Sequence, residues 1–422
     1  MGENAKLNKG KKITALILMM FSLNTIYLLP YLMYTYYTPL QDAMGLLGQD
    51  AAYGKLLNVY GIANVILYIP GGWLADKYDA KKLLVISMIS TGVLGIWEGM
   101  FPSYGTLLII FVLYAVTTVL TYWSASIKVI NLISDPEEQG SMYGTLEAGR
   151  GIIGILITTA FVFIYAALAS QSNAAAMKWI CWITGFIMIA VGLAIWLLFP
   201  NTAREGTVNK SLIDSFKAVG VAFKIPITYL LAGMIFAACL CQASISYYGP
   251  YLENICGMSS KFVVFFANYN RTICTLIAAS IAAFLSRKIG NSAKIIVFAA
   301  IGDALAYLIL LIVPGSASVV ALVLLLFIIA TLFYAVLRAL YYACIDEIGT
   351  HKNVVGSVIG IASILGFCPD MFYTTLAGSW LEADPVGGYN KIFMACIAAS
   401  LLGVICAGIT IKMVAKKQAA KE

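Results

Sequence analysis

The stretch YYTPL at residues 36–40 recurs as YYGPY at residues 247–251, displaced by 211 positions. Farther along, Lys128 returns as Arg338, displaced by 210 positions. The chain therefore consists of two related halves. A membrane protein built from two parallel halves has a natural binding place for a solute at the seam between them, near the bilayer midplane.

Composition indicates a membrane protein. Hydrophobic residues make up 61% of the chain and charged residues only 11%, far below the roughly 25% of a soluble domain. The nine cysteines lie almost entirely in apolar stretches without metal-type spacing, so we expect buried apolar side chains. The net charge of +7 follows from the distribution of Lys and Arg among the loops, and no nucleic-acid partner is expected.

Apolar stretches of about 20 residues, long enough to cross the hydrocarbon layer, recur twelve times. They lie near residues 13–35, 53–75, 83–101, 106–132, 142–167, 178–199, 226–249, 260–286, 294–313, 318–344, 355–377 and 391–412. Most of the 27 Lys and Arg residues fall on the side of the bilayer that holds both termini. The positive-inside rule therefore predicts a multi-pass protein of the cell (cytoplasmic) membrane with both termini in the cytoplasm.

The spans divide the chain into two bundles joined by one long linker. We predict an N-terminal six-helix bundle at 1–200 and a C-terminal six-helix bundle at 226–422. The linker, 201–225, carries Leu212, Ile213, Phe216 and Val219 at helical spacing opposite two lysines. This pattern predicts a short helix on the inner membrane surface.

The segment GWLADKYDAKK at residues 72–82, between spans two and three, resembles the signature loop of the major facilitator superfamily. Asp79 replaces the usual glycine of that loop and Ala80 the usual arginine. The resemblance covers essentially the whole chain and implies an all-α fold of twelve transmembrane helices in two parallel-related halves. It also implies a gating role for Asp76, and by extension Lys77, in which the carboxylate meets a basic residue and a helix N-terminus.

A second resemblance comes from residues 122–128 (YWSASIK) and 147–151 (EAGRG). These segments are similar to a bacterial permease branch associated with sugar-phosphate, sulfonate or nitrate-like solutes. The resemblance implies an organic or inorganic anion as the substrate.

Four basic residues lie inside predicted spans: Lys128, Arg150, Arg271 and Arg338. Buried charges are costly in a membrane and usually face a partner or a water-filled cavity. The family resemblance places spans 1, 4, 7 and 10 around a central cavity, completed by 2, 5, 8 and 11, and all four cations fall on these spans. Lys128 and Arg338 are also equivalent by the repeat, so we expect them to face one another across an anion.

The alternative is that the cations are neutralised by acids within the protein. Glu147 precedes Arg150 by three residues, a helical spacing that permits a salt bridge, and Asp370 on span eleven could pair with Arg271 or Arg338. Either acid could instead carry a coupling proton. If all the cations are paired, the substrate would be a neutral sugar or nucleoside-like solute.

Aromatic side chains form a second candidate wall. Tyr27, Tyr31 and Tyr34 follow an i, i+4, i+7 pattern on span one, and Trp123 lies about one turn from Lys128. A tyrosine offers a flat apolar face and a hydroxyl, which suits a sugar or a small organic anion. We expect Tyr27, Tyr31 and Trp123 to contribute to substrate binding.

Residues 149–154 (GRGIIG) match a dinucleotide-binding fingerprint, but that motif needs a strand before it, and inside a membrane helix it indicates close helix packing. The sequence has no Walker loop, His-Glu-x-x-His or Gly-x-Ser-x-Gly motif, so we expect no enzyme activity, cofactor or metal. The predicted function is secondary active transport of a small solute, expected to be an organic or inorganic anion, across the cell membrane by alternating access. A co-transported ion or an exchanged solute would supply the energy. The alternative is a proton-coupled carrier of a neutral sugar or nucleoside-like solute.

Overall fold

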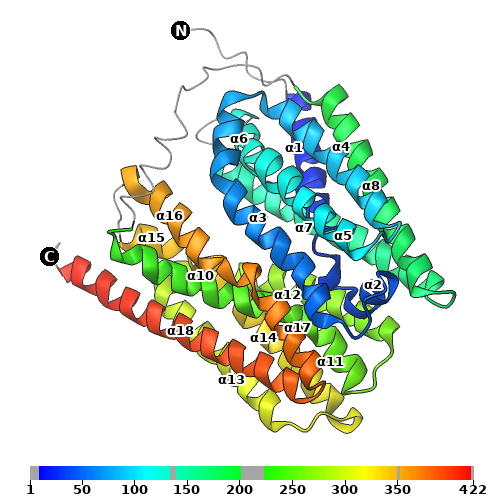
Figure 1. The fold of residues 1–422 in the computed structure, drawn as a ribbon. Coiled ribbons are helices and arrows are strands. Elements are labelled where there is room, and N and C mark those ends of the chain that lie inside the picture. The colour runs from blue at the N-terminus through cyan, green and yellow to red at the C-terminus, as the bar shows by residue number, and fades with distance from the viewer. Residues whose placement is uncertain (1–8, 134–138, 201–222, 349–351, 420–422) are drawn as a thin grey trace. The chain divides into compact units, whose positions relative to one another are not determined.

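In the computed structural model of the protein, residues 9–133, 139–200, 223–348 and 352–419 are described, and all regular structure within them is helical (Figure 1). A helix satisfies its own backbone hydrogen bonds, which a chain in hydrocarbon requires. The described residues form two compact units.

The first unit comprises the described residues within Met1–Leu32 and Ala63–Leu212. Its elements are α1 (Lys9–Thr25), the second part of α3 (Asp50–Lys77), α4 (Ala80–Glu98), α5 (Tyr104–Ala115), η2 (Val116–Trp123), α6 (Ser124–Ile133), α7 (Gln139–Leu168) and α8 (Asn173–Leu198). Helix α4 packs against α8, and α1 packs against α7 and α8.

The contact between α4 and α8 depends on a pair of facing glycines. A Cβ at Gly92 would lie 2.5 Å from the Gly185 carbonyl oxygen, and one at Gly185 would lie 2.6 Å from the Gly92 oxygen. Small residues allow two membrane helices to approach this closely, where van der Waals packing is the main attraction.

The second unit comprises Met33–Ile62 and the described residues within Ile213–Glu422. From the first half it contains η1 (Leu32–Tyr34), α2 (Tyr37–Ala43) and the first part of α3. From the second half it contains α10 (Pro226–Ser244), η3 (Ile245–Tyr247), α11 (Tyr248–Asn254), α12 (Ser260–Ile289), α13 (Ser292–Ile312), η4 (Ala317–Val319), α14 (Val320–Leu340), α15 (Ala343–Ile348), α16 (Lys352–Gly366), η5 (Cys368–Met371), α17 (Tyr373–Ala383) and α18 (Gly387–Ala419).

Helical elements cover all twelve predicted spans. Within the described ranges, nine are long and apolar enough to cross a membrane unaided, and α3 makes a tenth if the segments on the two sides of its bend, Asp50–Tyr68 and Pro70–Lys77, are counted as one span. These two segments meet at an angle of 53°, because proline removes a helical hydrogen bond and its ring clashes with the preceding turn.

The two remaining spans are interrupted. Helix α1 ends at Thr25, so the prediction of a continuous helix over 13–35 is wrong there, and Tyr27 and Tyr31 lie in consecutive turns beyond its end. The eleventh span is broken between α16 and α17 by the short 3-10 turn that contains Pro369. Interrupted spans are where transporters commonly expose backbone and polar side chains to a solute.

Candidate functional site

Arg271 lies near the middle of α12, a helix of 30 residues. Its guanidinium carbon is 4.7 Å from the centre of the Tyr34 ring, a cation–π contact. One turn earlier, the buried Asn268 has a side-chain nitrogen with no acceptor among the residues that the structure describes. Since positions i and i+3 share a helix face, Asn268 and Arg271 form a strip of hydrogen-bond donors.

Asp370 lies in η5, at the break in the eleventh span. The Cys239 thiol of α10 donates to its carboxylate, with 3.2 Å between Sγ and Oδ1. The Asn58 amide of α3 donates to the Asp370 backbone oxygen at 2.9 Å. The break leaves this oxygen outside the regular helical pattern, and Asn58 supplies the hydrogen bond that a helix would have provided.

Arg338 lies in the last turn of α14 and donates through Nη1 to the side-chain oxygen of Gln242. It also interacts electrostatically with Asp370. The Tyr34 hydroxyl interacts in the same way with both Arg271 and Asp370. These electrostatic interactions show that the two arginines and the carboxylate lie in one region of the second unit.

We call these residues the arginine cluster: Tyr34, Asn58, Gln242, Arg271, Arg338 and Asp370. They come from spans 1, 2, 7, 8, 10 and 11, all of which the family resemblance assigns to the cavity wall. With two guanidinium groups and one carboxylate, the cluster carries a formal excess of one positive charge. This arrangement can bind an oxyanion through charge-assisted, two-pronged hydrogen bonds.

A tight backbone contact lies beside the cluster, and we call it the α3–α17 seam: Gly54, Asn58, Gly61, Thr374 and Gly378. The Thr374 hydroxyl donates to the Gly54 oxygen at 2.7 Å, and the Asn58 side-chain oxygen accepts from the backbone nitrogen of Thr375 at 2.8 Å. A Cβ at Gly61 would lie 2.4 Å from the Asp370 backbone oxygen. The seam thus joins the first part of α3 to the segment that carries Asp370.

The first unit has an aromatic group around η2, which is a π-helix. The Tyr27 hydroxyl donates to the Thr118 backbone oxygen at 3.2 Å, and its ring meets those of Tyr122 and Trp123 edge-on, with 6.4 Å between centroids in each pair. The structure therefore brings together Tyr27 and Trp123, two of the residues that the sequence predicts for substrate binding, and that role stays a prediction. Tyr31 is partly exposed.

The backbone of Arg150, on α7, accepts a hydrogen bond from helix α1. The Asn24 amide donates to the Arg150 carbonyl oxygen at 3.1 Å, and the Arg150 guanidinium interacts electrostatically with Tyr122. This places Arg150 beside the aromatic group of the first unit. Asn24 also has a buried side-chain oxygen with no hydrogen-bond donor within the described part of the chain.

Two lysines in or near the signature loop donate hydrogen bonds to carbonyl groups at the C-terminal ends of helices. The Lys128 ammonium donates to the Ala75 carbonyl at 2.7 Å, near the end of α3, and the Lys81 ammonium donates to the Phe199 carbonyl at 2.7 Å, just beyond α8. Both contacts satisfy terminal carbonyls and complement the negative end of the helix dipole. Lys77 instead lies over the Trp73 ring, with 4.8 Å from Nζ to its centre.

Asp76 is exposed and makes no hydrogen bond or ion pair with other described residues. The neighbouring Asp79 caps the N-terminus of α4 by accepting from the Lys81 backbone nitrogen at 2.8 Å. The gating role of Asp76 stays a prediction. So does the meeting of Lys128 with Arg338, which belong to different units.

Two further predictions concern residues that the structure does not describe. Glu147 lies within α7, but its side chain is outside the described part of the molecule. The predicted interfacial helix of the linker falls in residues 201–222, also outside the described ranges.

Three contributors to the arginine cluster are not among the residues for which the sequence predicts a site role: Tyr34, Asn58 and Gln242. Each is a polar residue in a span that the resemblance assigns to the cavity, which is a weak signal shared with many other positions. Asn58 has the clearest role because its amide binds backbone atoms more than 300 residues away in the chain. The eight cysteines other than Cys368 are buried, as predicted.

A family model described as "Major Facilitator Superfamily" matches residues 13–372. Two inner membrane proteins of Escherichia coli (strain K12) are similar over nearly the whole chain. YqcE is 27% identical over 405 residues, which cover 94% of each protein. YihN is 25% identical over 405 residues, which cover 93% of this chain and 94% of that protein.

Solved structures of transporters share the fold. A bacterial homologue of the human lysosomal transporter Spinster, described as inward-facing and occupied, has a TM-score of 0.69 at 15% identity and covers 98% of this chain and 97% of its own. A D-xylose–proton symporter has a TM-score of 0.70 at 13% identity, covering 96% and 97%. The nucleoside transporter NupG has a TM-score of 0.66 at 14% identity, covering 97% and 99%.

Proposed function

Because the chain belongs to the Major Facilitator Superfamily, and is thus a multi-pass membrane transporter rather than an enzyme, we propose that it carries a small organic or inorganic anion. The two halves would expose the site to each side of the cell membrane in turn, with both termini in the cytoplasm. The arginine cluster would contact the anion in the second half of the chain. Arg150, Lys128, Tyr27, Tyr31 and Trp123 would contact it from the first half.

The observation that carries this proposal is the state of Arg271. Its guanidinium is near the middle of a membrane-spanning helix, yet no carboxylate of the described residues pairs with it. A charge at this depth costs several kcal/mol unless a partner or water compensates it. The Tyr34 ring offsets part of that cost, and an anionic solute would offset the rest. The unpaired donor of Asn268 adds a neutral hydrogen bond to the same ligand.

One observation favours the neutral-solute alternative. Arg338 has both Gln242 and Asp370 as partners, so a single arginine remains for the substrate. A sugar or nucleoside could then bind through Asn268, Gln242 and the tyrosines. Two of the structural relatives are described as a D-xylose–proton symporter and a nucleoside transporter.

Coupling and gating complete the proposal. Asp370 is well placed to take up a proton or to act as a fixed counter-ion, because it lies at the break in its span, where Cys239 and Asn58 donate to it and Arg338 interacts with it. Glu147 would have the corresponding role in the first half. Asp76 and Lys77 would control opening toward the cytoplasm.

Replacing Arg271 tests the substrate charge directly. Arg271→Gln keeps hydrogen-bonding capacity and removes the charge, so an anion should lose about 1.5–3 kcal/mol, or roughly 10- to 150-fold in affinity. Arg271→Lys should recover only part of the loss because an ammonium lacks the planar fork. Lys288→Gln is the matched control, since it removes an exposed charge from the end of the same helix.

The assay is uptake of labelled anionic and neutral solutes into proteoliposomes, together with binding to the purified protein. Neutral substitutions at Lys128 and Arg338 should each weaken anion binding, and the double substitution should abolish it. If binding survives the loss of charge at Arg271, Lys128 and Arg338, the anion proposal is wrong. A neutral solute would instead give variants that fold poorly and recover when Asp370 is also neutralised.

A further inference from the structure

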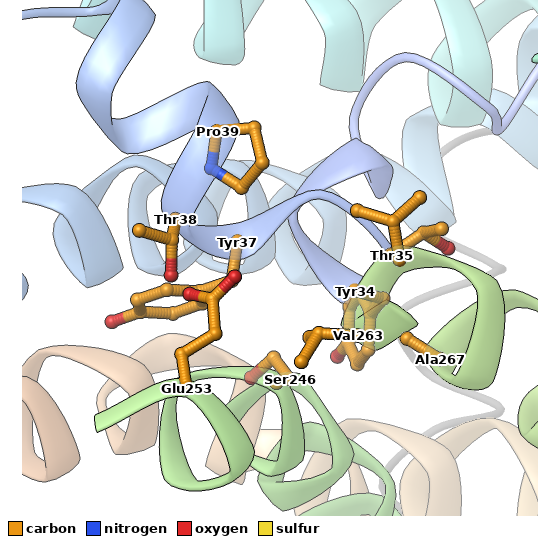
Figure 2. A pocket seen from close by; sticks show the side chains of 11 residues that line it. Tyr34, Thr35, Tyr37, Thr38, Pro39, Ser246, Glu253, Val263 and Ala267 are labelled. Atoms are coloured by element: carbon orange, nitrogen blue, oxygen red, sulfur yellow. The ribbon is translucent and has the colours of Figure 1, made fainter. Parts of the chain in front are cut away.

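A small pocket lies in the second unit next to the arginine cluster. On one side the pocket is bounded by the end of η1, the turn that follows it and helix α2, and on the other side by η3, α11 and α12. Tyr34 and Glu253 are among the lining residues. Figure 2 shows the Glu253 side chain reaching from its helix toward Thr38 and Tyr37. The space inside is about enough for one water molecule.

Two hydroxyl oxygens of the pocket lining can serve as neutral ligands. The Ser246 hydroxyl donates to the Ala243 carbonyl at 2.6 Å, so its oxygen has only lone pairs left to offer a ligand. The Thr38 side chain interacts with the Glu253 carboxylate, toward which that side chain reaches in Figure 2, and its hydroxyl oxygen can bind a cation through its lone pairs.

Glu253 gives the pocket its charge. One carboxylate oxygen, Oε1, is buried and has no hydrogen-bond partner among the residues described. Val263, Val264 and Ala267 supply apolar lining. In such surroundings a carboxylate either takes up a proton or has a positive charge beside it, and the neighbouring hydroxyl groups supply no such charge.

The volume of the pocket and its single carboxylate together favour a small monovalent cation as the ligand. A pocket for one water-sized sphere excludes organic cations. Divalent ions bound by protein oxygens usually take several carboxylates, whereas this pocket contains one, and the described residues hold no group of three or more His, Cys, Asp or Glu side chains that could bind a metal. Carboxylate and hydroxyl oxygens are suitable ligands for a hard alkali ion.

We propose that this pocket binds Na⁺, with Glu253 as the charged ligand and the hydroxyl oxygens of Thr38 and Ser246 as neutral ligands. Tyr34 lines the pocket, and its ring is also in cation–π contact with Arg271. The bound cation and the solute would therefore both lie next to the Tyr34 side chain. Na⁺ would then be the coupling ion. This last step rests on the proposed function, whereas Na⁺ binding itself does not.

The binding test uses the purified full-length protein without any solute. Its thermal unfolding is followed while NaCl replaces KCl or choline chloride at constant ionic strength and constant pH. A ligand that binds only the folded state raises the unfolding temperature in a saturable way. We expect this rise with Na⁺ and little or none with K⁺ or choline.

Three variants locate the site. Glu253→Gln should abolish the Na⁺ response, and Ser246→Ala should raise the half-saturating Na⁺ concentration by about ten-fold, the effect of losing one modest ligand contact. Asp384→Asn is the control, because it neutralises an exposed carboxylate outside the pocket and keeps an acceptor for the start of α18. It should respond to Na⁺ like the unmodified protein.

Equal unfolding temperatures in Na⁺ and K⁺ would overturn the proposal, as would a full Na⁺ response in Glu253→Gln. If the unfolding temperature depends on pH but not on Na⁺ at any pH, the site binds a proton, and the Na⁺ proposal is again overturned. If Glu253→Gln fails to fold, Thr38→Val and Ser246→Ala with direct ²²Na⁺ binding decide the question. Retained Na⁺ binding without anion transport would refute the proposed substrate and leave the cation site standing.

Discussion

The α3–α17 seam predicts a strong effect for a very small substitution, Gly54→Ala. A Cβ at Gly54 would lie 2.2 Å from the Thr374 carbonyl oxygen and 2.5 Å from its carbon. These are backbone atoms, so no side-chain rotation can relieve the clash. An ordinary contact begins at 3.4 Å, and the two segments must therefore separate by about 1.2 Å, the difference between 3.4 and 2.2 Å.

The free-energy cost has two parts. Overpacking of this kind typically costs about 1–3 kcal/mol, and separation weakens the hydrogen bond from Thr374 to the Gly54 oxygen, which contributes about 1 kcal/mol. Alanine returns about 1 kcal/mol through its higher helix propensity. The net destabilisation of the closed seam is about 1–3 kcal/mol, which shifts the equilibrium toward an opened seam by roughly 5- to 150-fold.

The measurement is the distance between nitroxide labels at Leu47→Cys and Val386→Cys, two exposed positions in the loops that precede α3 and follow α17. Gly54→Ala should increase the population of long distances and change the transport rate. Gly72→Ala is the control, because Gly72 is on the same helix and its Cβ would meet no atom within 4 Å. Equal distance distributions and equal transport rates in the two variants would refute the reasoning.

Two other substitutions test separate parts of the molecule. Asp76→Asn should slow transport while leaving substrate affinity within a few-fold, and unchanged turnover would contradict the gating role. The backbone N–H groups of Gly387 and Val386 hold the pKa of Asp384 below its usual value, so the ionised cap stabilises the fold above about pH 4 and this stabilisation is lost as the pH falls further. In Asp384→Asn the unfolding temperature should fall less at acid pH than in the unmodified protein. Identical dependence of the unfolding temperature on pH in the two proteins would show that Asp384 is not the source of the acid-dependent loss.

The sequence was sufficient for the fold because hydrophobic length and lysine placement are strong, additive signals. The same signals do not show where the first and eleventh spans are interrupted or where α3 bends. Apolar composition runs through the turns after Thr25, so the end of α1 left no trace in the hydropathy pattern. Pro70 and Pro369 are better markers, since a proline inside an apolar span weakens the helix at a known point, and both lie at a bend or break in the structure.

The candidate site could be predicted in its charges and only partly in its contacts. Arg271 and Asp370 stand out because ionisable groups are rare in spans. Lys128 stands out for the same reason, yet its ammonium serves a helix end, a local use that sequence cannot distinguish from substrate binding. Asn58 has no charge to draw attention, and its partners are set by tertiary packing.

The π-helical stretch Val116–Trp123 bears on the history of the chain. The offset between the halves is 211 residues at the YYTPL repeat, before this stretch, and 210 at Lys128 and Arg338, after it. The equivalent helix of the second half, α14, is α-helical throughout. A π-helical turn holds more residues than an α-helical turn, so one extra residue in the fourth span would fit both the wider turn and the shorter offset. One residue corresponds to about 100° of α-helix rotation, so such a residue would turn the segment that carries Lys128 about the helix axis relative to its Arg338 counterpart.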